Sequence, residues 1–177
     1  MRIISLKPIG QVDRSLLAPL AEGLTQRLRV ACSIQPGGLE AEFAFNPLRR
    51  QYHSTEILKR IIARPSSESW KVLGVTEMDL YIPVLTFVFG EAQLADGGAV
   101  VSAHRLRQEF YGMPTDPELL NERLLKEALH ELGHTYGLRH CPDYTCVMSA
   151  SNGVERIDLK SPEFCPACAQ LMPADAS

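Results

Sequence analysis

The sequence predicts an α+β fold in which helices flank a mixed β-sheet and the C-terminal part is irregular. Three observations support this prediction. Strand-like and helix-like segments alternate over residues 1–137, one helix leads into a histidine-rich motif at residues 130–140, and four of the five cysteines follow that motif. The chain has 177 residues, 45% of them hydrophobic and 22% charged, which is enough for one domain with a substantial core.

The N-terminal part of the chain is expected to supply three strands and one helix. A strand is expected at residues 3–9 and a helix at residues 15–30, where leucines recur on one side. Residues 30–34 and 42–45 could each form a strand, and the Pro36-Gly37-Gly38 turn separates them.

The middle of the chain is expected to supply a second helix and the rest of the sheet. Ser54 or Thr55 is the expected N-terminal cap of this helix, and Pro65 ends it. Three strand-like runs follow, at residues 71–75, 85–90 and 99–103. Strands and helices in this order are typical of a mixed sheet with flanking helices.

A third helix is expected to carry the histidine motif. Asp116-Pro117-Glu118 is a good helix start, because a capping residue is followed by a proline at the first helical position. Helical spacing of apolar residues continues from there to Gly137. We therefore expect the motif to lie at the C-terminal end of this helix.

The motif itself predicts a catalytic metal site. It contains H-E-x-x-H, which places His130 and His134 on one face of a helix with Glu131 beside the first of them. In a continuous helix His140 would point about 240° away from His134, but Gly137 can adopt the left-handed conformation that folds the chain back. Three neutral imidazoles would then bind one zinc ion and leave its fourth position open, as in catalytic sites. The alternative, an amphipathic helix with surface histidines, does not explain why the glycine and third histidine follow in register.

The chemistry of such a site indicates a role for each residue. Zinc lowers the pKa of its bound water from 15.7 to about 7, which supplies a nucleophile at neutral pH. Glu131 is rotated by about 100° from His130 on the helix and is therefore not expected among the ligands. It is instead placed to act as general base and then as general acid in hydrolysis of a peptide bond by the zinc-bound water.

The cysteines that follow indicate a second metal site. Cys141, Cys146, Cys165 and Cys168 have the spacing C-x4-C and C-x2-C, which is typical of a closed four-thiolate zinc site. Two disulfides, a redox-active Cys165–Cys168 pair and an iron–sulfur cluster are alternatives. We favour structural zinc because it is the commonest occupant of such sites. Cys141 directly follows His140, so a closed thiolate site would hold the segment that presents the third histidine.

The run from residue 130 to residue 168 resembles the archaemetzincins, a branch of the metzincin zinc metalloproteases. The resemblance implies that His130, His134 and His140 bind the catalytic zinc and that Glu131 is the general base. It implies that a second zinc is bound by Cys141, Cys146, Cys165 and Cys168. It also implies that Met148 forms the Met-turn, a hydrophobic floor under the catalytic metal. One departure is the gap of sixteen residues between Met148 and Cys165, one shorter than is usual in the family.

The resemblance also implies how the first part of the chain is used. It implies a twisted sheet whose antiparallel edge strand lines the cleft, and residues 85–91 are the candidate strand. An extended peptide or protein substrate would pair with the main chain of this strand.

These observations predict one metzincin-like catalytic domain at residues 1–172, with a sheet and helix part at 1–137, a zinc-stapled part at 138–172, and a flexible tail at 173–177. The net charge of −3 without a lysine or arginine block argues against a nucleic-acid partner. No apolar run reaches transmembrane length, and the first eight residues are too short and interrupted for a signal peptide. Cysteines kept as thiolates fit a cytoplasmic protein, and we expect a monomer with two zinc ions.

A different class of function is also compatible with the sequence. A metzincin scaffold with little or no turnover could act as a zinc-containing binding or regulatory module. Glu131 favours the enzyme, because zinc binding alone does not require it.

Overall fold

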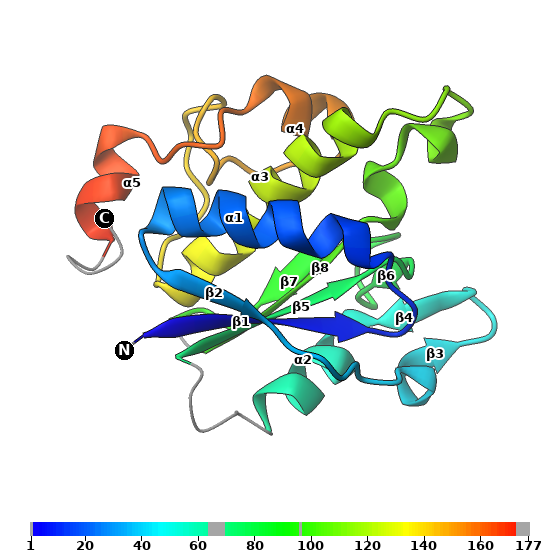
Figure 1. The fold of residues 1–177 in the computed structure, drawn as a ribbon. Helices are drawn as coiled ribbons and strands as arrows, with labels where there is room; N and C mark the ends of the chain where they lie inside the picture. The colour runs from blue at the N-terminus through cyan, green and yellow to red at the C-terminus, as the bar shows by residue number, and fades with distance from the viewer. Residues whose placement is uncertain (1, 64–69, 96, 173–177) are drawn as a thin grey trace.

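A five-stranded sheet in the order β2-β1-β5-β8-β7 is the centre of the computed structural model, which describes residues 2–63, 70–95 and 97–172 (Figure 1). Its strands are β1 (Ile3–Ile9), β2 (Ala31–Ile34), β5 (Lys71–Thr76), β7 (Gly90–Ala92) and β8 (Gly98–Ser102). The first four strands in spatial order are parallel, and β7 is antiparallel to β8 at one edge. The predicted mixed sheet is therefore confirmed.

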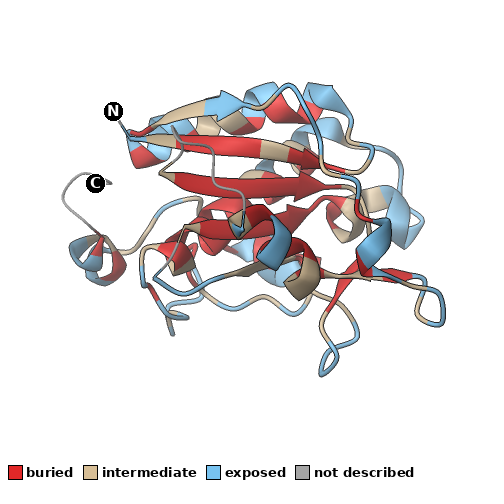
Figure 2. Ribbon diagram, turned by 90° about the horizontal axis from the view of Figure 1, so that it is seen from below, coloured by how far each residue is buried: buried red, intermediate tan, exposed pale blue. Residues whose placement is uncertain are grey.

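The inner strands of the main sheet are largely buried because helices cover both faces of the sheet. Every residue of β5 and β8 is buried (Figure 2). On one face lie α1 (Leu17–Leu28) and α3 (Pro117–Thr135), and on the other lies α2 (Ser54–Ile62) (Figure 1). Helix α1 turns its buried leucines, Leu17, Leu20, Leu24 and Leu28, toward the core.

Short elements complete the N-terminal part. A second sheet has the order β3-β4-β6, with strands β3 (Phe45–Asn46), β4 (Gln51–His53) and β6 (Leu80–Tyr81). Single 3-10 turns occur at Arg14–Leu16, Glu42–Ala44, His104–Leu106 and Gln108–Tyr111. No helix among the described residues combines the length and apolar character needed to cross a membrane.

The C-terminal part is irregular, as expected, and contains only α4 (Val154–Leu159) and α5 (Pro166–Leu171). Isolated backbone hydrogen bonds connect its loops, for example from Val147 N to Glu163 O (3.0 Å) and from Ser161 N to Thr145 O (2.8 Å). Buried residues of this part, including Met148 and Ile157, belong to the same apolar cluster as β1 and α3.

Several predicted elements are confirmed with small shifts. The strand at residues 3–9 has the predicted bounds, and the strands near residues 30–34, 71–75 and 99–103 differ by one residue at one or both ends. The helix expected at residues 15–30 forms as a 3-10 turn followed by α1. The proposed tail at residues 173–177 lies outside the described residues.

Three local predictions are wrong. Residues 42–44 form a 3-10 turn and only Phe45 enters a strand. Helix α2 begins at Ser54 without a side-chain cap, because the hydroxyls of Ser54 and Thr55 donate instead to the carboxylate of Glu91. The edge strand expected at residues 85–91 is shorter and shifted, since β7 starts only at Gly90.

Candidate metal centres and active site

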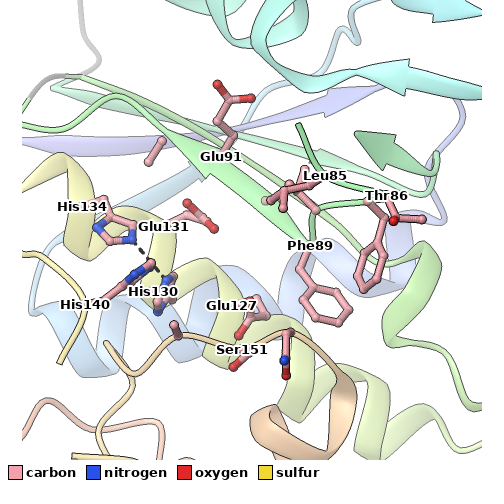
Figure 3. Close-up of a pocket in the computed structure, with 16 residues that line it drawn as sticks. Leu85, Thr86, Phe89, Glu91, Glu127, His130, Glu131, His134, His140 and Ser151 are labelled. Carbon is pink, nitrogen blue, oxygen red and sulfur yellow. Dashed lines mark hydrogen bonds between the residues drawn. The ribbon is translucent and has the colours of Figure 1, made fainter. Parts of the chain in front are cut away.

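The end of α3 brings the three histidines of the motif together. Asp116 caps the start of the helix by accepting a hydrogen bond from Leu119 N (3.0 Å), as the sequence predicts. The helix ends at Thr135, and Gly137 has a φ of 94°, which lets the chain reverse. This reversal directs His140 toward His130 and His134 (Figure 3).

The geometry of the three imidazoles fits a single tetrahedral ion. Ring centroids are 4.7 to 5.2 Å apart, and the candidate ligand nitrogens all lie within 4.8 Å of one another. The Nε2 atoms of His130 and His134 are 3.1 Å apart. Two nitrogens that each lie about 2.0–2.1 Å from one tetrahedral zinc would be separated by roughly 3.3 Å.

Main-chain carbonyls hold two of these rings in the tautomer that a metal needs. His130 Nδ1 lies 2.8 Å from Val147 O, and His134 Nδ1 lies 2.8 Å from Leu138 O. A carbonyl can only accept, so each Nδ1 carries the proton and each Nε2 keeps a free lone pair. Burial lowers the pKa of His130 well below its usual value and also lowers the pKa of His134. Both rings are therefore neutral near pH 7, as ligands must be.

Glu131 lies beside the histidines in the same pocket. Its side chain packs against Gly90 of β7, where an added Cβ would lie 2.7 Å from Glu131 Cγ and 2.8 Å from Glu131 Oε1. Burial raises the pKa of Glu131 well above its usual value, and the nearby carboxylate of Glu127 adds to this effect. A carboxylate with a raised pKa next to a metal site is suited to proton transfer.

The pocket around these side chains forms a cleft with two walls. One wall is made by residues 85–92 and the other by α3 together with residues 150–152. In Figure 3 the histidines and Glu131 lie at one end, and Phe89, Glu127 and Ser151 lie further along. The predicted role of residues 85–91 as a wall of the cleft is thus compatible with the structure, although most of them are not in a strand.

The four cysteines also converge. Their sulfurs lie within 4.8 Å of one another, and Cys141 Sγ is 3.8 Å from Cys165 Sγ. All five cysteines of the chain are free thiols in this structure. The backbone N–H of Cys168 lowers the pKa of the Cys165 thiol, and backbone N–H groups of Met148 and Cys165 donate to Cys146 Sγ. Burial raises the pKa of the Cys141 and Cys168 thiols, so of these three thiols only Cys165 is shifted toward the thiolate in this structure.

Met148 links the two centres. Its side chain is fully buried, and its sulfur fills the space where a Cβ on Gly133 would be placed. Its carbonyl accepts from Cys141 N at 2.9 Å, so the segment between the two ligand sets is held in place. Met148 thus packs against α3 near the histidines, and its role as the Met-turn stays a prediction of the resemblance.

The other two histidines of the chain, His53 and His104, do not line the pocket. His53 stacks on Tyr81, with ring centroids 5.2 Å apart, and His104 Nδ1 donates to Glu77 O. Sequence reasoning missed Gly90, Glu127 and Lys160, which contact or surround the site. Of these three residues, only Glu127 could have been predicted from the sequence, because it lies one helical turn before Glu131 on the same helix.

Comparisons with known proteins agree with this geometry. Residues 48–173 match the sequence profile described as Peptidase family M54. The chain is 42% identical over 175 residues to an archaemetzincin from Thermococcus kodakarensis, covering 95% of this chain and 94% of the relative. It is 43% identical over 165 residues to an archaemetzincin from Methanocaldococcus jannaschii, covering 93% and 89%.

Solved structures are similar as well. The crystal structure of a zinc-dependent peptidase from Methanocorpusculum labreanum has a TM-score of 0.87 and 32% identity, covering 96% of this chain and all of that chain. The archaemetzincin from Archaeoglobus fulgidus complexed with malonate has a TM-score of 0.84 and 37% identity, covering 96% and 99%.

The fold and the site thus define a zinc metallopeptidase of the metzincin class. Within that class, the chain belongs to peptidase family M54, the archaemetzincins. The resemblance noted in the sequence and the predicted α+β fold class are confirmed.

Proposed function

We propose that His130, His134 and His140 hold the catalytic zinc of this peptidase and that Glu131 is its general base and acid. The observation that carries the proposal is the convergence of three imidazoles, two of them oriented by carbonyls so that Nε2 is free. When bound, zinc would act as a Lewis acid toward the scissile carbonyl and lower the pKa of water in its open position.

Glu131 would carry the proton through the reaction. Its carboxylate is buried beside the histidines and faces the pocket rather than the protein core. It would accept a proton from the attacking water and deliver it to the amine that leaves when the C–N bond breaks. Its raised pKa would make it a stronger base than an exposed glutamate.

The substrate would be a peptide or protein bound in an extended form. Strand β7 is the last strand of the five-stranded sheet, and its three residues line the pocket. An extended chain could therefore add to this edge by main-chain hydrogen bonds.

Cys141, Cys146, Cys165 and Cys168 would hold a second zinc with a structural role. Four thiolates complete a tetrahedral shell and leave no position for substrate. The shared apolar cluster of Met148, Ile157 and β1 supports a single catalytic domain at residues 1–172. The monomeric state and the cytoplasmic location stay predictions.

Replacement of Glu131 by glutamine tests the proposal, because the amide keeps the shape of the side chain and removes its basicity. We expect zinc content and folding to match the parent, while cleavage of a mixed peptide library falls by about 10²–10⁴-fold. Glu109→Gln is the control, since Glu109 is exposed and lies outside the pocket. Parental cleavage by the Glu131 variant would remove this residue from the mechanism, and zinc binding without any cleavage by the parent would favour a binding module.

A further inference from the structure

A buried ion pair connects Glu127, which lines the active-site pocket, to Lys160. The Lys160 side chain is fully buried and the Glu127 side chain is 4% exposed, with Lys160 Nζ 3.0 Å from Glu127 Oε1. Removing two charges from water is costly, and a buried pair is therefore weak evidence for a purely stabilising role.

The ammonium group of Lys160 also reaches the main chain that orients a proposed zinc ligand. Lys160 Nζ donates to Val147 O at 3.3 Å, and the same carbonyl accepts from His130 Nδ1 at 2.8 Å. Val147 lies between Cys146, in the cysteine cluster, and Met148, which packs against Gly133. One carbonyl thus joins the lysine, the Met148 segment and the first histidine.

Glu127, the carboxylate of the ion pair, lies in the wall of the cleft. It lies one helical turn before Glu131 on α3 and lines the same pocket (Figure 3). Since α3 also carries His130, the ion pair fixes the Val147 carbonyl relative to the helix that presents the ring. A carbonyl held in this way would restrict the rotation of the His130 imidazole.

We propose that Lys160 and Glu127 are positioning residues for the active site, which hold His130 in its metal-binding orientation through the Val147 carbonyl. The inference rests on the proposed role of His130 as a zinc ligand. Neither residue is assigned a part in bond making or proton transfer. Partners that orient a metal-bound histidine typically contribute about 10–100-fold to metal affinity or activity.

A second buried lysine on the same elements provides a matched control. Lys126 is 2% exposed, donates to Ile157 O at 3.3 Å and pairs with Glu122 Oε1 at 2.6 Å. It links α3 to α4 much as Lys160 links the end of α4 to α3, but it donates to the Ile157 carbonyl and not to that of Val147. Its replacement removes a comparable structural link and leaves the Val147 carbonyl untouched.

The test compares Lys160→Met with Lys126→Met in the zinc-loaded chain. Zinc affinity of the three-histidine site is measured by competition with a chelator, and kcat and KM are measured on a cleaved peptide. We expect Lys160→Met to weaken zinc binding at the histidines by about 10–100-fold and to lower kcat more than it changes KM. Lys126→Met should lose stability but keep parental zinc affinity and kcat when folded.

A double variant keeps the test valid if a lone Glu127 carboxylate prevents folding. Lys160→Met with Glu127→Gln leaves no unpaired charge and should show the same loss of zinc affinity, with Lys126→Met and Glu122→Gln as its control. Two results would overturn the positioning role alone. One is a parental zinc affinity in the Lys160 variants, and the other is an equal loss of zinc affinity in the Lys160 variants and in their Lys126 controls. A parent that binds no zinc at the histidines would overturn the proposed function as well.

Discussion

Two glycines, Gly90 and Gly133, shape the site because they have no side chain. An added Cβ on Gly90 would lie 2.6 Å from Val100 O and 2.7 Å from Glu131 Cγ. An added Cβ on Gly133 would lie 3.1 Å from Met148 Cε and closer still to the sulfur. These glycines leave the space that Glu131 and Met148 occupy, so the positions of both side chains depend on them.

Replacement of Gly90 by alanine tests this dependence. Because the backbone of Val100 cannot move easily, the new methyl group should displace the Glu131 carboxylate. We expect peptide cleavage to fall by about 10²-fold, as for other small misplacements of catalytic groups, with zinc content unchanged. Gly37→Ala is the control, since nothing lies within 4 Å of a Cβ at that position. A Gly90 variant that cleaves peptides at the parental rate would contradict this account.

For single residues, the sequence predicts contacts between neighbours in the chain and misses contacts between distant segments. The spacing of His130, Glu131 and His134 needs only the periodicity of one helix, and Gly137 adds one turn. Gly90 and Lys160 could not be predicted, because their contacts with the site join segments that are far apart in the chain. Only the folded sheet and the irregular C-terminal part bring them together.

Among the elements, the irregular segment after α3 depends on the cysteine cluster for its shape. The segment from His140 to Met148 has few regular hydrogen bonds, yet it must present one proposed ligand and the Val147 carbonyl. Cys141 and Cys146 lie near the two ends of this segment. A metal ion bound by them would fix the conformation of the segment, as backbone hydrogen bonds do in a helix or strand.

Replacement of Cys165 by serine should therefore unfold this segment first. A structural zinc contributes about 10–16 kcal/mol in small zinc peptides, so we expect a loss on the order of several kcal/mol in the free energy of unfolding. Thermal denaturation and zinc analysis measure the effect, and Cys32→Ser is the control because Cys32 lies outside the cluster. Unchanged melting temperature and zinc content in the Cys165 variant would defeat the structural role.

The wall of the cleft at residues 85–89 shows why the predicted edge strand is wrong. The β-branched and aromatic residues of this run favour a strand. In the structure, however, side chains bind two of its main-chain carbonyls. Arg49 Nη2 donates to Leu85 O at 2.6 Å and to Thr86 O at 3.2 Å, and Gln51 Nε2 donates to Thr86 O at 2.9 Å. Tertiary contacts therefore override the local preference for a strand.

Replacement of Arg49 by alanine should loosen this wall and weaken substrate binding. Loss of one or two charge-assisted hydrogen bonds predicts an increase in KM of about tenfold, with kcat and zinc content close to parental. Arg14→Ala is a matched control, because Arg14 donates to Pro36 O at 2.7 Å and lies outside the pocket. An unchanged KM would show that the wall does not depend on Arg49.

At the scale of the whole molecule, the sequence predicts the fold class but not all of its parts. The four parallel strands of the main sheet are recovered because they are strand-like runs bounded by turns or helices, whereas the antiparallel edge strand β7 is not. The β3-β4-β6 sheet could not be predicted, because its strands are two or three residues long and Tyr52 pairs with Leu80 across a large gap in sequence. One apolar cluster extends from β1 through α3 to Met172, so both candidate metal centres lie on the main core.

Zinc analysis of the chain purified without added metal tests the central claim most directly. Two clusters of candidate ligands predict two zinc ions in the parent, and His140→Ala should lose the ion at the histidines and keep the ion at the cysteines. His140 is exposed, so its replacement should leave the fold intact. A parent with only one tightly bound zinc, or a His140 variant that retains both with parental affinity, would contradict the account.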